Sequence, residues 1–476
     1  MRADAAEKPD KLDPVEAWQP WEPGDKRLGL KWAGHLYRRA AFGATREELQ
    51  RAAAESPTAA LDRLFVIDPK AVARDSDLAQ QGLEIARRNN PFDLRGWWLD
   101  RMLHSGHPLR EKMTLFWHNH FATSITKIQS ADLMLRQNEL MRQHALGKFG
   151  PMLQLMSKEP AMLIWLDSNS NVKGKPNENY AREVMELFSL GVGNYTETDI
   201  REAARAFTGW HTDGQRYTFK EGLHDEESKT VLGQKGNWDG SDVVRICLEQ
   251  KTCARFLVRK MYRFFVSEAV QPTDEFLAPL ADLYRKSSYD TAAVVRKILL
   301  SRHFSSEQSY RCRIKSPVEY VLGLTRALGQ GFVSPRSLVG HLELLGQHLF
   351  APPNVKGWEG GTAWLNTATI VVRHNLAYTM ALGGGALNLG DPDPYGVAAI
   401  AVDPSALARR ERPPIAAPEK LVSFYADLLL QGDLSKEARA RLKTFLTKDN
   451  PEDHERDRRI REMIHALLTT PEYQLA

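Results

Sequence analysis

Residues 108–124 read PLREKMTLFWHNHFATS, and this stretch decides the fold class that the sequence predicts. Apolar residues recur in it every three or four positions, the spacing at which side chains share one face of a helix. A helix that opens near Pro108 and runs through His120 would carry one stripe, made of Leu109, Met113, Phe116, Trp117 and His120. The stretch therefore predicts a helix that buries this stripe.

The same helical spacing recurs from one end of the chain to the other, whereas strand-like alternation is scarce. We therefore predict an all-α protein with a large, bundle-like body of many helices and long irregular loops. Further helices are expected near 58–66, 76–89, 93–104, 108–121, 131–145, 149–156, 178–190, 242–251, 253–267, 274–286, 291–302, 316–329 and 335–347. The pairs Thr45 with Glu48 and Asp199 with Glu202 have the spacing of helix N-terminal caps.

Breaks in the helical pattern suggest how the chain is organised. Between about 211 and 241 Gly, Asp and Lys are frequent, which is typical of a long loop and would allow a short hairpin. Gly and Pro also deny regular hydrogen bonding to a second segment, 383–419. The predicted parts are an irregular N-terminal arm at 1–27, a main helical domain with the candidate site at 28–382, a linker or long loop at 383–419, and a C-terminal helical unit packing on the main domain at 420–476.

Composition excludes several classes of protein. The 476 residues include 64 Lys and Arg against 60 Asp and Glu, so the chain lacks the one-sided charge of a nucleic-acid binder. The three cysteines form no CxxC pair, which argues against a disulfide framework or a thiolate zinc site. No run approaches the roughly 20 apolar residues of a membrane span, and no signal peptide is visible. We expect a soluble protein, cytoplasmic by default, although an exported mature form would look the same.

The first candidate site is the pair His118 and His120. His120 belongs to the apolar stripe and is expected to point inward, as a hydrogen-bonded core residue, a catalyst or a ligand. His118 would lie about 160° away around a regular helix, so both rings cannot bind one ion unless the helix ends there. A surface or capping role is the simplest expectation for His118.

The second candidate is PNENYAREVMELFSLGVGNY at 176–195. In helical register the polar residues gather opposite an apolar arc, and they are Glu178, Asn179, Arg182, Glu183 and Glu186. Glu178 and Arg182 stand four residues apart and are expected to pair. If the row is covered, Glu183 or Glu186 could act as a general acid or base; if it is exposed, charge pairing explains it.

Two further segments are candidates. The loop at 211–241 offers a base, a carboxylate and a cation in His224, Asp225 and Lys229. The segment FAPPNVKGWEGGTAWLNTATIVVRHN at 350–375 offers an aromatic and polar wall for a flat, hydroxylated ligand, formed by Trp358, Trp364, Asn366 and Arg373. Loop solvation and tryptophans wedged between helices are the structural alternatives.

Taken in order, five phrases resemble a known bacterial family, the domain of unknown function 1800. They are HLYRRAAFGAT, REKMTLFWHNHFATS, NENYAREVMELFSLGVGNYTETDIREAARAFTGW, HDEESKTVLGQKG and PPNVKGWEGGTAWLNTATIVVRHN, and the likeness runs from about residue 33 to the C-terminus. The family carries no established catalytic residues. Its members are often encoded beside sulfatase-like proteins, so the resemblance implies a polysaccharide or envelope-derived substrate and a sulfatase-like partner protein.

We predict a hydrolase that acts on a polar or carbohydrate-like substrate. The predicted catalytic residues are Glu183, Glu186, His120 and Asp225, and a divalent metal is a possible cofactor, with His118, His120 and His224 as its ligands. The predicted binding residues are Asn177, Glu178, Asn179, Arg182, Lys229, Trp358, Trp364, Asn366 and Arg373. The alternative is a non-enzymatic helical scaffold that binds an envelope polymer or the sulfatase-like protein.

Overall fold

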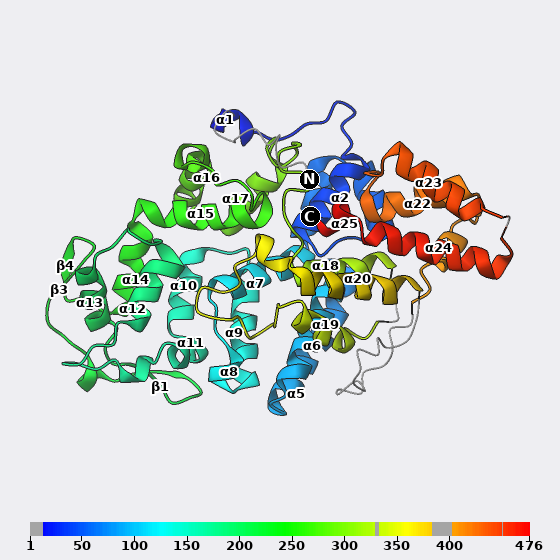
Figure 1. The fold of residues 1–476 in the computed structure, drawn as a ribbon. Helices are drawn as coiled ribbons and strands as arrows, with labels where there is room; N and C mark the ends of the chain where they lie inside the picture. The colour runs from blue at the N-terminus through cyan, green and yellow to red at the C-terminus, as the bar shows by residue number, and fades with distance from the viewer. Residues whose placement is uncertain (1–12, 329–332, 383–401, 450) are drawn as a thin grey trace.

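The computed structural model describes residues 13–328, 333–382, 402–449 and 451–476 (Figure 1). It confirms the all-α prediction, because helices make up the body and the strands in these residues form only two small hairpins. The helices of the first half are α1 Pro14–Ala17, α2 Gly29–Ala40, α3 Arg46–Ala54, α4 Pro57–Phe65, α5 Val72–Arg87, α6 Pro91–His104, α7 Pro108–His120, α8 Ile125–Ile128, α9 Ala131–His144, α10 Phe149–Ser157, α11 Pro160–Trp165, α12 Asn179–Glu183 and α13 Glu197–Ala206.

The second half continues in the same way. Its helices are α14 Gly240–Glu249, α15 Lys251–Phe265, α16 Asp274–Lys286, α17 Thr291–Leu300, α18 Pro317–Leu328, α19 Leu338–Leu344, α20 Thr367–Leu382, α21 Ala406–Arg410, α22 Pro418–Leu430, α23 Lys436–Thr447, α24 Asp453–Leu468 and α25 Pro471–Gln474. Single 3₁₀ turns are η2 Pro69–Ala71, η3 Ser168–Ser170, η5 Glu221–Leu223, η6 Pro335–Ser337 and η7 Gly361–Trp364. The turn η4, Val184–Ser189, is a π-helix.

One of the two predicted helix caps is confirmed and the other is wrong. Thr45 and Glu48 form a reciprocal capping box at the start of α3. The helix α13 begins at Glu197, with Thr196 as its cap, so the predicted cap at Asp199 lies three residues too far along the chain. The hydroxyl of Thr196 accepts from the Asp199 N–H and the Asp199 carboxylate accepts from the Thr196 N–H, which makes Asp199 the second member of the box.

The predicted hairpin in the segment 211–241 is confirmed, and there are two. Strand β1, Trp210–Thr212, pairs with β2, Tyr217–Phe219, and β3, Lys229–Val231, pairs with β4, Gln234–Gly236. The connection between β3 and β4 is Leu232 and Gly233, both with positive φ. Two positive φ values match the twist of a tight hairpin, and a glycine makes one of them easy to adopt.

The C-terminal helices α22, α23 and α24 pack on one another, and α24 lies along α20 (Figure 1). The chain then returns to the main body, where the Ala476 N–H donates to the Arg313 carbonyl at 2.8 Å. Of the predicted linker, 383–401 lies outside the described residues, and the rest contains α21 and the start of α22. The division into domains stays a prediction. None of the described helices is both long and apolar enough to cross a lipid bilayer.

The helix α7 is buried on all its faces, because α2, α4, α6 and α9 pack around it. Most of its polar residues are therefore as buried as its apolar stripe, and the buried set includes Glu111, Lys112, Thr114, His118 and His120. The expectation of a surface or capping role for His118 is wrong, since its side chain has no exposed area. The periodicity identified one buried face, but neighbouring helices cover the other.

The carboxylate of Glu111 shows how a charge on α7 is accommodated. It accepts two hydrogen bonds from the Arg142 guanidinium of α9, at 2.6 and 3.0 Å, and one from the Trp98 indole of α6 at 3.3 Å. Burial by itself would raise the pKa of Glu111, but Arg142 and Arg101 hold it below its usual value. The group is therefore an ionised link between three helices.

A second buried link joins α7 to α18. The Lys112 ammonium of α7 donates to the Glu319 carboxylate, which also lies 3.4 Å from the Arg313 guanidinium and accepts from the Ser316 N–H at 2.8 Å. Lys112 also donates to the Arg38 carbonyl of α2 at 3.3 Å. These contacts place three helices at fixed distances around a charged centre.

We predict that Glu111→Gln lowers the free energy of unfolding by about 3–5 kcal/mol, the usual cost of removing one partner from a buried ion pair. Urea denaturation with a spectroscopic readout measures it. The folded-state pKa of Glu111 is lowered, so its stabilisation is present above the unfolded-state pKa and is lost as pH falls through the folded-state value. The difference in the free energy of unfolding between wild type and Glu111→Gln should accordingly become smaller at acidic pH.

The matched control is Glu249→Gln, because the Glu249 carboxylate pairs with Arg245 at the surface of α14. That variant should unfold at nearly the wild-type urea concentration. Equal shifts for the two variants would contradict the role given to the buried pair.

Candidate functional site

The C-terminal end of α7 is joined to a segment more than 200 residues away in the chain. The Phe350 N–H donates to Nε2 of His118 at 3.2 Å. Asn119 exchanges two hydrogen bonds with the backbone of Trp358, at 2.6 and 3.3 Å. Gly357 adopts φ +81°, and a Cβ there would lie 2.1 Å from the Asn119 side-chain oxygen, so only glycine fits. The segment 350–358 is thus fixed against α7.

His120 is bonded through both ring nitrogens. Its Nε2–H donates to the Phe188 carbonyl at 3.1 Å, and the Lys260 ammonium of α15 lies 2.9 Å from Nδ1 and donates to it. Burial, with a contribution from Lys260, holds the His120 pKa well below its ordinary value, so the ring is neutral. Burial also lowers the pKa of Lys260 to about 7, helped by the charge of Arg263.

Lys260 is a residue that the sequence analysis missed. Among the described residues no carboxylate lies within ion-pairing distance of its ammonium, and the side chain is only partly exposed. A signal was present in the sequence, because Lys260 follows Leu257 by three positions and precedes Phe264 by four. A lysine inside an apolar stripe marks a buried amine, which is a common feature of functional sites.

The helix predicted at 178–190 exists, but it changes type where the two glutamates lie. Glu183 ends α12, and Glu186 belongs to the π-helix η4. Both side chains are half-buried, and the Tyr195 hydroxyl donates to the Glu186 carboxylate at 2.7 Å. Burial raises the pKa of Glu183, and the charge of Glu186 raises it further, while Lys356 partly offsets the shift.

The π-helix ends in a way that connects it to His120. Gly191, with φ +84°, terminates the helix, and the N–H groups of Leu190 and Gly191 both reach back to the Met185 carbonyl. The last carbonyls of a helix lack partners within it, and that of Phe188 is satisfied by His120. His120 and the two glutamates are therefore attached to the same short turn.

Other predicted binding residues of this region have structural partners. The predicted pair of Glu178 and Arg182 is confirmed at 3.1 Å, and Arg182 also bonds Glu197 of α13 at 2.8 Å. The side-chain oxygen of Asn177 accepts from the Asn179 N–H at 2.9 Å, and the Asn177 amide donates to the Ser170 hydroxyl. These residues position the start of α12.

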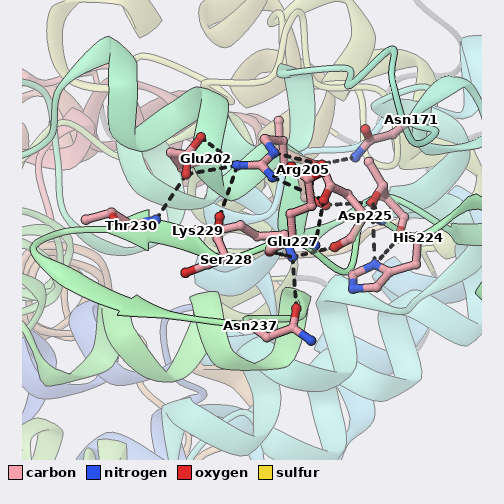
Figure 2. A network of polar contacts seen from close by, with 12 residues as sticks. Asn171, Glu202, Arg205, His224, Asp225, Glu227, Ser228, Lys229, Thr230 and Asn237 are labelled. Carbon is pink, nitrogen blue, oxygen red and sulfur yellow. Dashed lines mark hydrogen bonds and ion pairs between the residues drawn. The ribbon is translucent and has the colours of Figure 1, made fainter.

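The third candidate segment forms a separate polar network around Arg205 of α13 (Figure 2). The Arg205 guanidinium donates to both oxygens of Asp225, at 2.7 and 3.1 Å, and to the Glu202 carboxylate at 3.0 Å. These hydrogen bonds hold the pKa of Asp225 below its usual value. His224 lies beside this network, with Nδ1 donating to the Thr208 carbonyl at 2.8 Å.

Lys229 completes this network from the first residue of β3. Its ammonium donates to the carbonyls of Asp225 and Glu227 and lies 3.4 Å from the Asn237 side-chain oxygen, as Figure 2 shows. The three hydrogens of this buried ammonium are all directed at protein oxygens, which join the loop before β3 to Asn237 after β4. The network therefore holds the β3–β4 hairpin against α13.

The four predicted wall residues of 350–375 have different surroundings. Trp358 and Trp364 are both 7 % exposed, and Trp358 lies against the ring of His118. Asn366 caps α20, because its side-chain oxygen accepts from the Thr369 N–H at 2.9 Å. Arg373 is buried and donates to the Lys315 carbonyl at 2.7 Å. Asn366 is exposed, and other exposed polar residues of this segment include Asn354, Lys356 and Glu359.

The structure thus brings part of the predicted site together. His120, the turn that carries Glu186, and the segment of Lys356 meet at the end of α7. In the described part of the chain no hydrogen bond or ion pair joins His224 or Asp225 to His120, Glu183 or Glu186. The three histidines predicted as metal ligands have separate partners. Within the residues that the structure describes, no three or more His, Cys, Asp or Glu side chains are grouped so that they could hold a metal ion.

Comparison with known proteins gives one match. The sequence model of the family described as "Protein of unknown function (DUF1800)" matches residues 35–475, nearly the whole chain. No curated protein and no solved structure matches significantly.

We predict that Lys260→Met changes the pH dependence of stability. Because the Lys260 pKa is lowered from 10.5 to about 7, the folded wild type carries the full penalty of a buried ammonium below pH 7. The penalty fades as pH rises toward the unfolded-state value. The variant should therefore gain most relative to wild type at about pH 6 and least at about pH 10, as thermal unfolding will show.

Lys251→Met is the control, since Lys251 is exposed on the same helix. The difference in unfolding temperature between Lys251→Met and wild type should stay constant across the pH range. If the difference between Lys260→Met and wild type were constant with pH as well, the Lys260 amine would titrate as an ordinary lysine.

We predict that Asp225→Asn loosens the β3–β4 hairpin, because two charge-assisted hydrogen bonds from Arg205 are weakened. Amide hydrogen exchange in β3 should become faster by about tenfold or more. Glu227→Gln is the control, since the Glu227 carboxylate is largely exposed and makes a single, longer contact of 3.4 Å with the same guanidinium. Unchanged exchange in Asp225→Asn would mean that the network does not hold the hairpin.

Proposed function

This chain belongs to the DUF1800 family, and we propose that it is a hydrolase in which Glu183 and Glu186 perform acid–base chemistry on a polar or carbohydrate-like substrate. The observation that carries the proposal is a pair of half-buried carboxyl groups at a π-helical turn. Such turns are rare and frequently occur at functional sites. In a regular surface helix, glutamates three residues apart would be solvated by water and unremarkable.

The two carboxyl groups have environments that suit different roles. Burial raises the pKa of Glu183, so this carboxyl group keeps its proton at higher pH than a free glutamate does. A carboxyl group of that kind can protonate a leaving group. Glu186 receives a hydrogen bond from the Tyr195 hydroxyl, which orients it, and in our proposal it acts as the base or nucleophile.

His120 and Lys260 act as positioning residues in this proposal. His120 donates to the Phe188 carbonyl, and Lys260 fixes the ring by donating to its other nitrogen. The end of η4 is thereby tied to α7 and α15. A misplaced carboxyl group loses much of its catalytic effect, so a rigid mount for the turn has functional value.

The substrate would meet the exposed residues of the fixed segment beside the carboxyl pair. Lys356 is exposed, and its charge is felt by Glu183, while Asn354 is exposed two residues earlier. A cation and an amide favour a substrate with hydroxyl or anionic groups. Trp358 and Trp364 are buried, so they support this segment from beneath. A polysaccharide substrate and a sulfatase-like partner protein stay predictions.

We predict that Glu183→Gln and Glu186→Gln each lower the turnover number by about 10²–10⁴-fold, the usual contribution of a general acid or base. Wild type is first screened against p-nitrophenyl glycosides, acetate, phosphate and sulfate, and the variants are then assayed on the probe that is cleaved. Glu249→Gln is the control, because Glu249 is paired with Arg245 on α14 and belongs to none of the candidate segments. It should keep wild-type turnover.

The pH profile gives a second measurement. If protonated Glu183 is the acid, the rate falls as pH rises through its raised pKa, and Glu183→Gln removes this limb. Folded variants that keep full turnover would overturn the assignment of these residues. Cleavage of none of the probes would favour the alternative, a helical scaffold without enzymatic activity.

A further inference from the structure

A cavity lies between α2, α18 and α22, and Glu319 of the Lys112–Glu319 pair forms part of its lining. Its inner volume is about 30 Å³, which is room for two or three water molecules at about 10–15 Å³ each. Part of its lining is apolar and comes from Leu49, Ala327, Leu428 and Leu429. The rest is polar and charged, from Arg38, Lys315, Glu319, Gln431 and the ring of Tyr473.

The one carboxylate in this lining is already neutralised. Glu319 bonds the Lys112 ammonium, lies 3.4 Å from Arg313, and accepts from the Ser316 N–H at 2.8 Å. Those partners come from outside the cavity. The negative charge of Glu319 is therefore balanced before the cavity's own cations are considered.

Lys315 has no such partner. The residue is 6 % exposed, and its ammonium lies 3.6 Å from the centre of the Tyr473 ring. Within the described residues, no carboxylate lies within 4.0 Å of this ammonium and no hydrogen-bond acceptor is bound by it. The largely buried ammonium therefore contacts an aromatic face in place of a hydrogen-bond acceptor, and a ring face replaces only part of the hydration that burial removes.

Arg38 adds a second cation to the same cavity. The residue is 7 % exposed, and one of its terminal nitrogens donates to the Gln431 side chain. Its Nε and Nη2 are buried and make no hydrogen bond of ordinary geometry in the described part of the chain, and the guanidinium carbon lies 5.4 Å from the centre of the Tyr310 ring. Nε and Nη2 can each present an N–H group on the same edge of the planar guanidinium. Two parallel N–H groups match the two oxygens of a carboxylate.

The charges around Lys315 disfavour its ammonium form when the cavity is empty. Burial lowers the pKa of Lys315 well below its ordinary value, and Arg38 of α2, Arg311 and Arg373 of α20 lower it further. Glu319 of α18 offsets only part of this. An anion in the cavity would reverse the balance, because an opposite charge nearby favours the protonated amine.

We propose that this cavity binds a small carboxylate anion, which accepts hydrogen bonds from Lys315 and balances the charge of Lys315 and Arg38. A monocarboxylate fits better than phosphate, because the polar donors are few and leucine and alanine line the remainder. The small inner volume favours acetate over larger acids, so propionate should bind more weakly than acetate.

The test uses the full chain and measures thermal unfolding and calorimetric binding with sodium acetate and sodium propionate, against sodium chloride at equal ionic strength. We expect a saturable rise in the unfolding temperature with the carboxylates, because a ligand that binds only the folded state stabilises it. Lys315→Met should weaken the binding by about tenfold or more, the loss expected for a hydrogen bond to a charged group.

Two further variants make the result decisive. Lys420→Met removes an exposed lysine of α22 and should respond as wild type does. Ala327→Leu places a larger side chain in the lining while Lys315 is kept, and it should abolish the response by filling the cavity. It also serves if Lys315→Met does not fold.

Three outcomes would overturn the proposal. They are no saturable effect of carboxylates on wild type, an equal response in wild type and Ala327→Leu, and an equal response to chloride and acetate. The last would indicate general screening of surface charge.

Discussion

The burial of α7 on all faces is the constraint on which the rest of the structure depends. A helix in that position must bond most of its polar side chains to other elements, because an unsatisfied buried group costs free energy that water no longer supplies. Its polar residues consequently bond other elements: Glu111 bonds α9, Lys112 bonds α18, His118 and Asn119 bond the segment 350–358, and His120 bonds η4 and α15. Hydrogen bonds with defined directions thus fix what apolar packing would leave free to slide.

The candidate site is a consequence of this arrangement. The hydrogen bonds at the end of α7 hold both the π-helical turn η4 and the segment 350–358, which carries the exposed Lys356. Fold and candidate site therefore depend on the same residues. Mutations at His118, Asn119 or His120 would therefore affect both stability and geometry. The glutamates extend from this scaffold without being part of its hydrogen-bond framework, which is the usual relation between a reactive group and a rigid mount.

Two buried lysines depart from the pattern of paired interior charges. Glu111 and Glu319 each have cationic partners within hydrogen-bonding distance, whereas Lys260 bonds a neutral imidazole and Lys315 lies against an aromatic ring. Proteins retain such groups where they serve something other than stability. Both lysines lie where we locate function, one behind the carboxyl pair and one in a cavity with a second uncompensated cation.

The sequence by itself determined most of the helices, although not α2 or α20, together with the capping box at Thr45, the hairpin segment and the pair of Glu178 with Arg182, because these depend on residues a few positions apart. It did not determine which polar residues are buried. His118 and Lys260 acquire their roles from partners 232 and 140 residues away, and the π-helical turn forms where Phe188 can reach His120. The separation of Asp225 from the glutamates was also decided by packing, since Arg205 binds Asp225 in a network of its own. Periodicity identifies the face of a helix, and only the tertiary structure decides what covers it.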